Sequence, residues 1–174
     1  MVYTMHWYVD GGCRGNGSSN SIAAASAIHM SRNGAYTSWT RKLPSYPRPT
    51  NQRAEITAII IALEQTLEKY DELDSSPYLD VTILSDSRYA VNCMNDWIYK
   101  WSENGWVNAE GNEVVNRDLI QEASRLDDRV KELGSVSYKW ISREENGIAD
   151  QKCNEVMNEQ GGSEGYYSSS DDGY

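Results

Sequence analysis

Cysteine and histidine are scarce in this sequence of 174 residues, which contains three of the first and two of the second. Cys13, Cys93 and Cys153 lie far apart, so they provide neither the spacing of a zinc site nor the even number of a disulfide framework. This use of cysteine favours a reducing compartment, and we expect an intracellular protein. His6 and His29 both lie in early segments with the pattern of strands.

Long apolar runs are also missing. The longest, AIIIAL at residues 58–63, is far too short to span a bilayer. The N-terminal stretch MVYTMHWYVDGG contains neither the basic start nor the apolar segment of a secretory signal. The length instead suits one domain with a substantial core, and we expect no membrane partner.

Basic residues are outnumbered by acidic ones, 16 against 26, and the formal net charge is −10. Non-specific binding of nucleic acids depends on clustered lysine and arginine, so the charge by itself argues against it. The binding of a polyanionic ligand would have to overcome this repulsion, which divalent cations could do.

Alternating and aromatic residues at 3–11 indicate a strand that ends at Asp10 and Gly11. Residues 12–20 are rich in glycine, serine and asparagine and are predicted to form a turn. Two further strands are expected on either side of Asn33-Gly34, a strong hairpin signal.

From residue 51 the apolar period changes to 3.6, which predicts a helix whose stripe contains Ile56, Ile59, Ile60, Leu63 and Leu67. The order of strands and helices predicts an α/β fold, in which helices cover a mixed sheet. Because the last fourteen residues contain only glycine, serine, tyrosine and acids, we expect a domain of residues 1–160 and a disordered acidic tail at 161–174. The other predicted segments are strands 21–30, 35–43, 78–86 and 135–142, and helices 51–70, 87–105, 113–133 and 146–159.

Four acids lie where predicted elements begin or end. Asp10 and Asp86 end strands, Glu55 is near the start of the first helix, and Asp150 is one turn into the last helix. Ligands of open α/β sheets bind outside the carboxyl ends of the strands, so these acids can converge there. Magnesium prefers oxygen ligands, and two such ions about 4 Å apart can activate water for phosphodiester cleavage. Simpler roles stay open, because Asp86 can cap the following helix and Glu55 can favour a helix start.

Four motifs in order resemble the catalytic domain of type 1 ribonuclease H over residues 3–158. They are YVDGGCRGNG, TNQRAEI, LSDSRY and NGIAD, and they contain Asp10, Glu55, Asp86 and Asp150 respectively. The resemblance implies a ribonuclease H-like fold with a five-stranded mixed sheet flanked by helices. It also implies that the four acids are catalytic and hold two magnesium ions, or manganese in their place.

The reaction implied by this resemblance is endonucleolytic hydrolysis of the RNA strand of an RNA–DNA hybrid, leaving a 3′-hydroxyl and a 5′-phosphate. Asn16, Asn51 and Gln52 would then contact the RNA strand in the minor groove, where the 2′-hydroxyl distinguishes RNA from DNA. We expect a monomer with the hybrid as its partner. The resemblance assigns further contacts to the DNA strand: Arg48, Thr50 and Asn116 around a phosphate, and Tyr89 and Trp97 against sugars.

The connection between the last strand and the last helix departs from the family pattern. Better-known members carry a flexible loop with a histidine there, which is thought to assist product release. Residues 140–146 make this connection without a histidine. A shorter variant of the family has an arginine in this region, and Arg143 resembles it; the alternative is a solvated surface arginine.

The basic, tryptophan-containing protrusion of many members is also altered. Between residues 97 and 117 the basic residues are Lys100 and Arg117, against three glutamates, Glu103, Glu110 and Glu113. We therefore expect weaker and more salt-sensitive binding of the hybrid. Trp97 and Trp101 are one helical turn apart, so a place in the core is an alternative for both, and the favoured one for Trp101.

Two competing functions stay open. A catalytically weak hybrid-binding module of the same fold is favoured by the acidic protrusion and disfavoured by the intact set of four acids. A DNA-directed nuclease of the wider superfamily, such as a junction resolvase, is disfavoured by Asn16, Asn51 and Gln52.

Overall fold

The computed structural model describes residues 1–160 as a five-stranded sheet with helices on both of its faces. The predicted tail at 161–174 lies outside the described residues. The elements are β1 (Val2–Arg14), β2 (Ile22–Met30), β3 (Tyr36–Lys42), α1 (Asn51–Glu72), β4 (Tyr78–Ser85), α2 (Arg88–Asn92), a π-helical segment (Cys93–Trp97), α3 (Ile98–Asn104), α4 (Arg117–Lys131), β5 (Gly134–Trp140), a 3-10 turn (Arg143–Asn146) and α5 (Gly147–Gln160).

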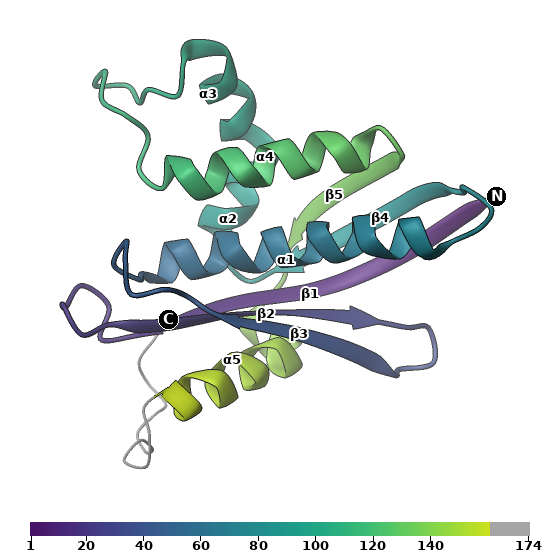
Figure 1. Ribbon diagram of the computed structural model, residues 1–174, viewed down its shortest axis with the longest axis horizontal. Coiled ribbons are helices and arrows are strands. Elements are labelled where there is room, and N and C mark those ends of the chain that lie inside the picture. Colours follow the sequence, from purple (N-terminus) through teal and green to yellow (C-terminus); the bar gives the residue numbers. More distant parts are fainter. Residues whose placement is uncertain (161–174) are drawn as a thin grey trace.

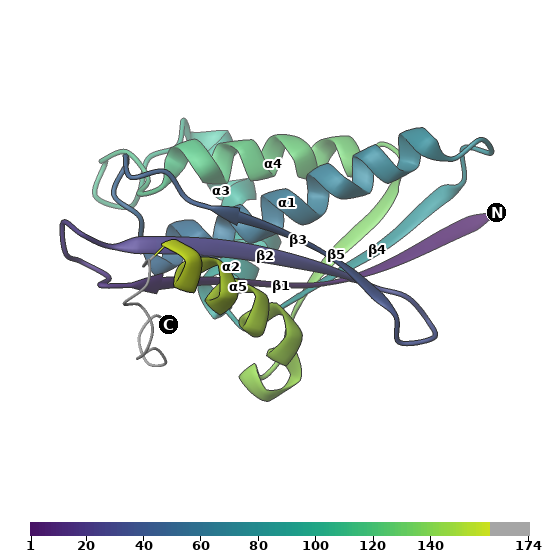
Figure 2. The same cartoon turned by 60° about the horizontal axis from the view of Figure 1, so that its bottom comes forward.

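The strands lie in the order β3-β2-β1-β4-β5. The first three are antiparallel neighbours, whereas β4 runs parallel to both β1 and β5, so the sheet is mixed as predicted. Helices α1 and α4 pack side by side on one face (Figure 1), and α5 covers β1 and β2 on the other, which Figure 2 brings forward. The Asn33-Gly34 hairpin is confirmed, with Gly34 at φ 89°.

The main core lies between the sheet and α1. Alternate residues of β1, Met5, Trp7 and Val9, are buried there, as strand periodicity requires. All five residues of the predicted α1 stripe are buried as well. A smaller cluster lies between α5 and β2 and consists of Ala24, Cys153 and Met157. No helix within residues 1–160 combines the length and apolarity needed to cross a membrane.

The first strand is longer than predicted. It pairs with β2 as far as Arg14, whereas its parallel pairing with β4 ends at Val9 and Ser85. Asp10 therefore lies inside β1, directly after the last residue that pairs with β4, and not at the end of the strand. The prediction ended the strand at Asp10 and Gly11, but Gly11 lies inside β1, where the lack of a side chain allows α1 to approach the strand, since an added Cβ would lie 2.3 Å from the carbonyl carbon of Ala54.

Two helices also differ from their predicted extent. The segment 87–105 is not one α-helix, because the π-helical segment Cys93–Trp97 interrupts it. The helix predicted from residue 113 begins only at Arg117. Its N-cap, Asn116, has the left-handed φ of 65°, which an α-helix does not continue through, and the preceding Val114 donates its N–H to the Trp106 carbonyl at 3.0 Å.

Candidate active site

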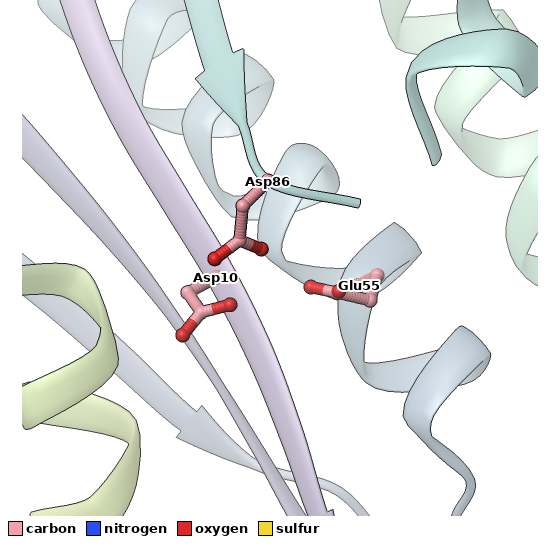
Figure 3. Close-up of side chains that lie close together, drawn as sticks. All are labelled: Asp10, Glu55 and Asp86. Atoms are coloured by element: carbon pink, nitrogen blue, oxygen red, sulfur yellow. The ribbon is translucent and has the colours of Figure 1, made fainter. Parts of the chain in front are cut away.

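Three carboxylates from separate elements meet at the sheet, beside the N-terminal half of α1 (Figure 3). Asp10 belongs to β1, Asp86 follows the last residue of β4, and Glu55 belongs to α1. Each offers an oxygen atom, and these oxygens lie within 4.8 Å of one another. Asp10 is only 1% exposed, so the group is buried on its strand side.

The register of the sheet and one hydrogen bond bring these carboxylates together. Because Val9 pairs with Ser85 in the parallel ladder, the next residues, Asp10 and Asp86, emerge side by side. The backbone N–H of Gly11 donates to Oε1 of Glu55 at 2.7 Å and turns this side chain toward the strand.

The structure assigns helix capping to other residues. The N-cap of α2 is Ser87, whose hydroxyl accepts the N–H of Ala90 at 3.1 Å, so Asp86 does not cap this helix. The N-cap of α1 is Thr50, and the first turn of α1 contains no acid. The simpler roles considered for Asp86 and Glu55 are therefore wrong.

Burial and mutual repulsion raise the pKa values of the carboxyls. For Asp10, burial is the largest cause, followed by the charges of Glu55, Asp86 and Asp150, and its pKa lies well above the usual range. Burial and the charge of Asp86 raise the pKa of Glu55 to about 8, against the opposing hydrogen bond from Gly11. In the metal-free chain the Glu55 carboxyl therefore holds a proton near neutral pH.

Asp86 is balanced by two neighbours. Burial raises its pKa, whereas a hydrogen bond from the Asn146 side chain and the charge of Arg143 oppose this effect. Asn146 is 1% exposed and donates from Nδ2 to the Val9 carbonyl at 2.8 Å, which ties the turn before α5 to β1. The exposed Arg143 also lowers the pKa of Glu55. Its charge therefore acts on both Glu55 and Asp86.

Asp150 lies next to the three-carboxylate group but is not part of it, because its oxygens are not all within 4.8 Å of the oxygens of the other three acids. Its charge and a hydrogen bond between the two carboxyls raise the pKa of Asp10. Two buried contacts hold α5 at this distance. Ser26 Oγ donates to the Ala149 carbonyl at 2.6 Å, and Cys153 Sγ donates to the Asp10 carbonyl at 3.1 Å.

The site fits a hard divalent cation. Its donors are carboxylate oxygens, the ligands that magnesium and manganese prefer. Asp10 Oδ2 is buried and has no hydrogen-bond partner among residues 1–160, and such an acceptor costs free energy unless something binds it. A cation between these acids would satisfy Oδ2 and remove the repulsion that raises their pKa values.

The residues expected to contact RNA gather around the start of α1. Asn16 Oδ1 accepts the backbone N–H of Asn51 at 3.2 Å, which links the loop after β1 to the helix. Gln52 is exposed, and its Oε1 accepts from Asn116 Nδ2 at 3.5 Å. Asn51 Oδ1 is buried and has no partner within the described part of the chain.

The residues expected around a DNA phosphate lie nearby. Thr50 accepts the Arg53 N–H at 3.1 Å, and Arg48 is exposed in the loop before α1. Asn116 accepts from Arg53 Nη1 at 3.3 Å, while Asp118 holds the same guanidinium through two hydrogen bonds of 2.9 and 2.6 Å. Sequence reasoning missed this role of Arg53, because no local pattern links it to residues 116–118.

The tryptophans of the protrusion form a chain of rings. Tyr89 meets Trp97 edge-on, with ring centroids 6.0 Å apart, and Trp97 meets Trp101 at 5.6 Å. All three are partly buried and pack against the main core, and Trp106 is 8% exposed. A core role therefore describes Trp101, as favoured above, while Tyr89 also accepts a hydrogen bond from Asn116 at 3.2 Å.

Comparison with known proteins agrees with this arrangement. The RNase H family model matches residues 3–159. A Ribonuclease H of Francisella tularensis subsp. novicida (strain U112) is 32% identical over 151 residues, which cover 87% of this chain and 86% of that protein.

Solved structures share the fold at lower sequence identity. RNase H1 from the halophilic archaeon Halobacterium salinarum NRC-1 has a TM-score of 0.63 at 22% identity, covering 90% of this chain and 99% of its own. LC11-RNase H1, solved in complex with an RNA/DNA hybrid, has a TM-score of 0.67 at 22% identity, covering 90% and 98%. With the family model matched over nearly the whole described chain, this protein belongs to the ribonuclease H family of nucleic acid hydrolases.

Proposed function

We propose that this chain is an endonuclease that hydrolyses the RNA strand of RNA–DNA hybrids, with Asp10, Glu55, Asp86 and Asp150 holding two divalent cations. The observation that carries the proposal is the group of three carboxylates, one buried and two partly buried, whose oxygens lie within 4.8 Å of one another. Membership of the ribonuclease H family supports the substrate, as does the hybrid bound by LC11-RNase H1. Magnesium is the preferred cation, with manganese as a substitute.

When bound, the two cations would supply an activated water and stabilise the leaving 3′-oxygen. The chain supplies the positions of the acids through the β1–β4 register and the Gly11–Glu55 hydrogen bond. Asn146 holds Asp86 and the turn before α5 on β1. Arg143, which lies near enough to lower the pKa of Glu55 and Asp86, is suited to assist release of the 5′-phosphate product.

Selection of RNA is assigned to Asn16, Asn51 and Gln52. Asn51 Oδ1 is the sharpest feature, because a buried acceptor without a protein donor within residues 1–160 suits a donor from the substrate, such as a 2′-hydroxyl. The Asn16 contact fixes the backbone beside it.

Contacts with the DNA strand are assigned to a second set of residues at the same end of α1. Arg53, which is ion-paired with Asp118, donates a hydrogen bond to the Asn116 amide. The Thr50 hydroxyl lies at the N-cap of α1. The Asn116 amide and the Thr50 hydroxyl are therefore suited to contact a phosphate. This set consists of Arg48, Thr50 and Asn116 for a phosphate and Tyr89 and Trp97 for sugars.

The test is cleavage of four duplexes of one sequence: RNA–DNA, DNA–RNA with the strands exchanged, double-stranded RNA and double-stranded DNA, each with magnesium and with a chelator. We expect cuts in the RNA strand of both hybrids only, with 5′-phosphate and 3′-hydroxyl ends, and none with the chelator. Asp10→Asn should remove the activity, while Asp80→Asn, an exposed aspartate of β4, should keep it.

Other outcomes identify the competitors. Binding of the hybrid without cleavage would indicate the catalytically weak module. Cleavage of double-stranded DNA at a rate similar to that of the hybrid would indicate a DNA-directed nuclease.

A further inference from the structure

An exposed aromatic side chain forms a hydrogen bond with the backbone of the candidate site. Trp140, the last residue of β5, is 41% exposed, and its indole N–H donates to the backbone carbonyl of Asp86 at 3.1 Å. The guanidinium of Arg88, two residues beyond Asp86, lies over the Trp140 ring at 3.9 Å from the centroid. Arg88 and Trp140 together are called the Arg88–Trp140 pair below.

Within residues 1–160, no carboxylate forms an ion pair with Arg88. Several exposed arginines of the chain form ion pairs, such as Arg41 with Glu64 and Arg125 with Glu122. Arg88 takes part in no ion pair within residues 1–160, and a neutral ring holds it instead. With no carboxylate paired to it in this part of the chain, its positive charge can attract an anion.

The contact with Trp140 covers one side of the guanidinium, and Arg88 as a residue is exposed. The N–H donors of a guanidinium match the oxygens of a phosphate, so this exposed group is suited to such a ligand. The ring also restricts the arginine side chain before a ligand arrives, so less conformational entropy is lost on binding.

We propose that the Arg88–Trp140 pair binds a backbone phosphate of the strand that is cut, adjacent to the phosphate held by the acids. This proposal rests on the proposed function. Arg88 makes the contact, and Trp140 is a positioning residue that orients Arg88 and links it to Asp86. The pair supplies positive charge beside the site in a chain of net charge −10 whose protrusion is acidic.

The first test is steady-state cleavage of a hybrid by Arg88→Gln at low salt. We expect a KM about tenfold higher with kcat within about twofold, since a contact made equally in substrate and transition state affects binding alone. The slope of log KM against log salt should fall by about 0.7–0.9, the value for one lost phosphate contact. Arg32→Gln removes the same charge from the exposed β2–β3 hairpin and should leave both quantities unchanged.

Variants of Trp140 separate positioning from general damage. Trp140→Leu removes the ring and should match the KM of Arg88→Gln. Trp140→Phe keeps a ring beneath Arg88 and should restore the wild-type KM. Loss of kcat with unchanged KM in Trp140→Leu would show that the ring does not act through Arg88.

A double-mutant cycle with the substrate then locates the contact. Single methylphosphonates, which are neutral, are placed at successive positions of the RNA strand. The wild type should lose affinity at one position next to the cut, and Arg88→Gln should show no further loss there. Equal KM values for Arg88→Gln and wild type, or equal losses at every position in both, overturn the proposal. If the hybrid is bound but not cut, the proposed function is refuted but the phosphate contact of Arg88 is not. The affinities of wild type and Arg88→Gln for the same substrates, measured in calcium, then test that contact.

Discussion

The backbone N–H of Gly11 donates a 2.7 Å hydrogen bond to Oε1 of Glu55, a residue 44 positions away in the sequence. This contact joins the residue after Asp10 to the helix that covers the sheet. It exists because Gly11 lacks a side chain, since a Cβ there would lie 2.3 Å from the Ala54 carbonyl carbon and 2.4 Å from the Glu55 nitrogen. The position of Glu55 in the site therefore depends on the glycine of a neighbouring strand.

Gly11→Ala should destabilise the protein by about 3 kcal/mol, because both atoms that the new methyl group meets belong to backbone and cannot move aside alone. Urea unfolding measures this loss. The matched control is Gly147→Ala, where φ is −62° and no atom lies within 4 Å of an added Cβ. This control should be neutral or stabilising by about 0.5–1 kcal/mol, and equal stabilities of the two variants would contradict the close-approach argument.

Asp86→Asn should abolish cleavage without loss of folding. The amide keeps the shape of the side chain but removes a charge that a cation needs, while relieving repulsion with Asp10 and Glu55. Turnover should fall by at least about 1,000-fold, and the melting temperature of the metal-free variant should equal or exceed that of the wild type. Asp80→Asn is the control, and near-normal turnover in Asp86→Asn would remove it from the site.

The stability of the metal-free protein should depend on pH through Glu55. Its pKa is about 8 in the folded state against an ordinary value of 4.5, so between these values the folded state binds a proton that the unfolded state has released. The stabilisation is complete below pH 4.5 and is lost as the pH rises to about 8. We expect the free energy of unfolding to fall less across this pH window in Glu55→Gln than in the wild type, by more than about 1 kcal/mol. Urea unfolding in the presence of a chelator measures both. The exposed Glu68→Gln should follow the wild type, and parallel curves for Glu55→Gln would refute the assignment.

Asn51→Ala combined with Gln52→Ala should weaken selection of RNA more than it affects folding. Losing hydrogen bonds to a 2′-hydroxyl should lower kcat/KM about tenfold on an all-RNA strand and much less on a strand with 2′-deoxy substitution beside the cut. Both substrates are compared at one salt concentration. The exposed Gln121→Ala of α4 is the control, and an unchanged ratio between substrates would place Asn51 and Gln52 outside the substrate site.

Glu103→Lys combined with Glu110→Lys should lower KM for the hybrid, because it restores positive charge to the protrusion. The gain should be largest at low salt and shrink as salt rises, with kcat unchanged, since each phosphate contact contributes roughly one unit of salt slope. Glu68→Lys with Glu132→Lys makes the same change in net charge at the other end of α1 and α4 and should have little effect. Equal KM values for the two double variants would show that the protrusion does not contact the hybrid.

Local patterns in the sequence were sufficient for most elements, whereas the prediction of the four acids also depended on the family motifs. The alternation around Trp7, the 3.6-residue stripe of α1 and the Asn33-Gly34 turn each depend on residues close together in the chain, and each is present in the structure. Asp86 was recognisable because a carboxylate ends an apolar strand. These features need no knowledge of which elements become neighbours.

Contacts between distant segments were decided by the tertiary structure alone. The sequence predicted that the first strand ends at Asp10 and Gly11, yet the strand continues to Arg14, and the packing of α1 on β1 makes Gly11 a donor to Glu55. Arg53 reaches Asn116 across 63 positions, and Trp140 reaches the carbonyl of Asp86 across 54. Periodicity reports only which face of its own element a side chain occupies. Which faces meet depends on the order and register of the strands, and these are set by burying the whole apolar surface of the sheet at once.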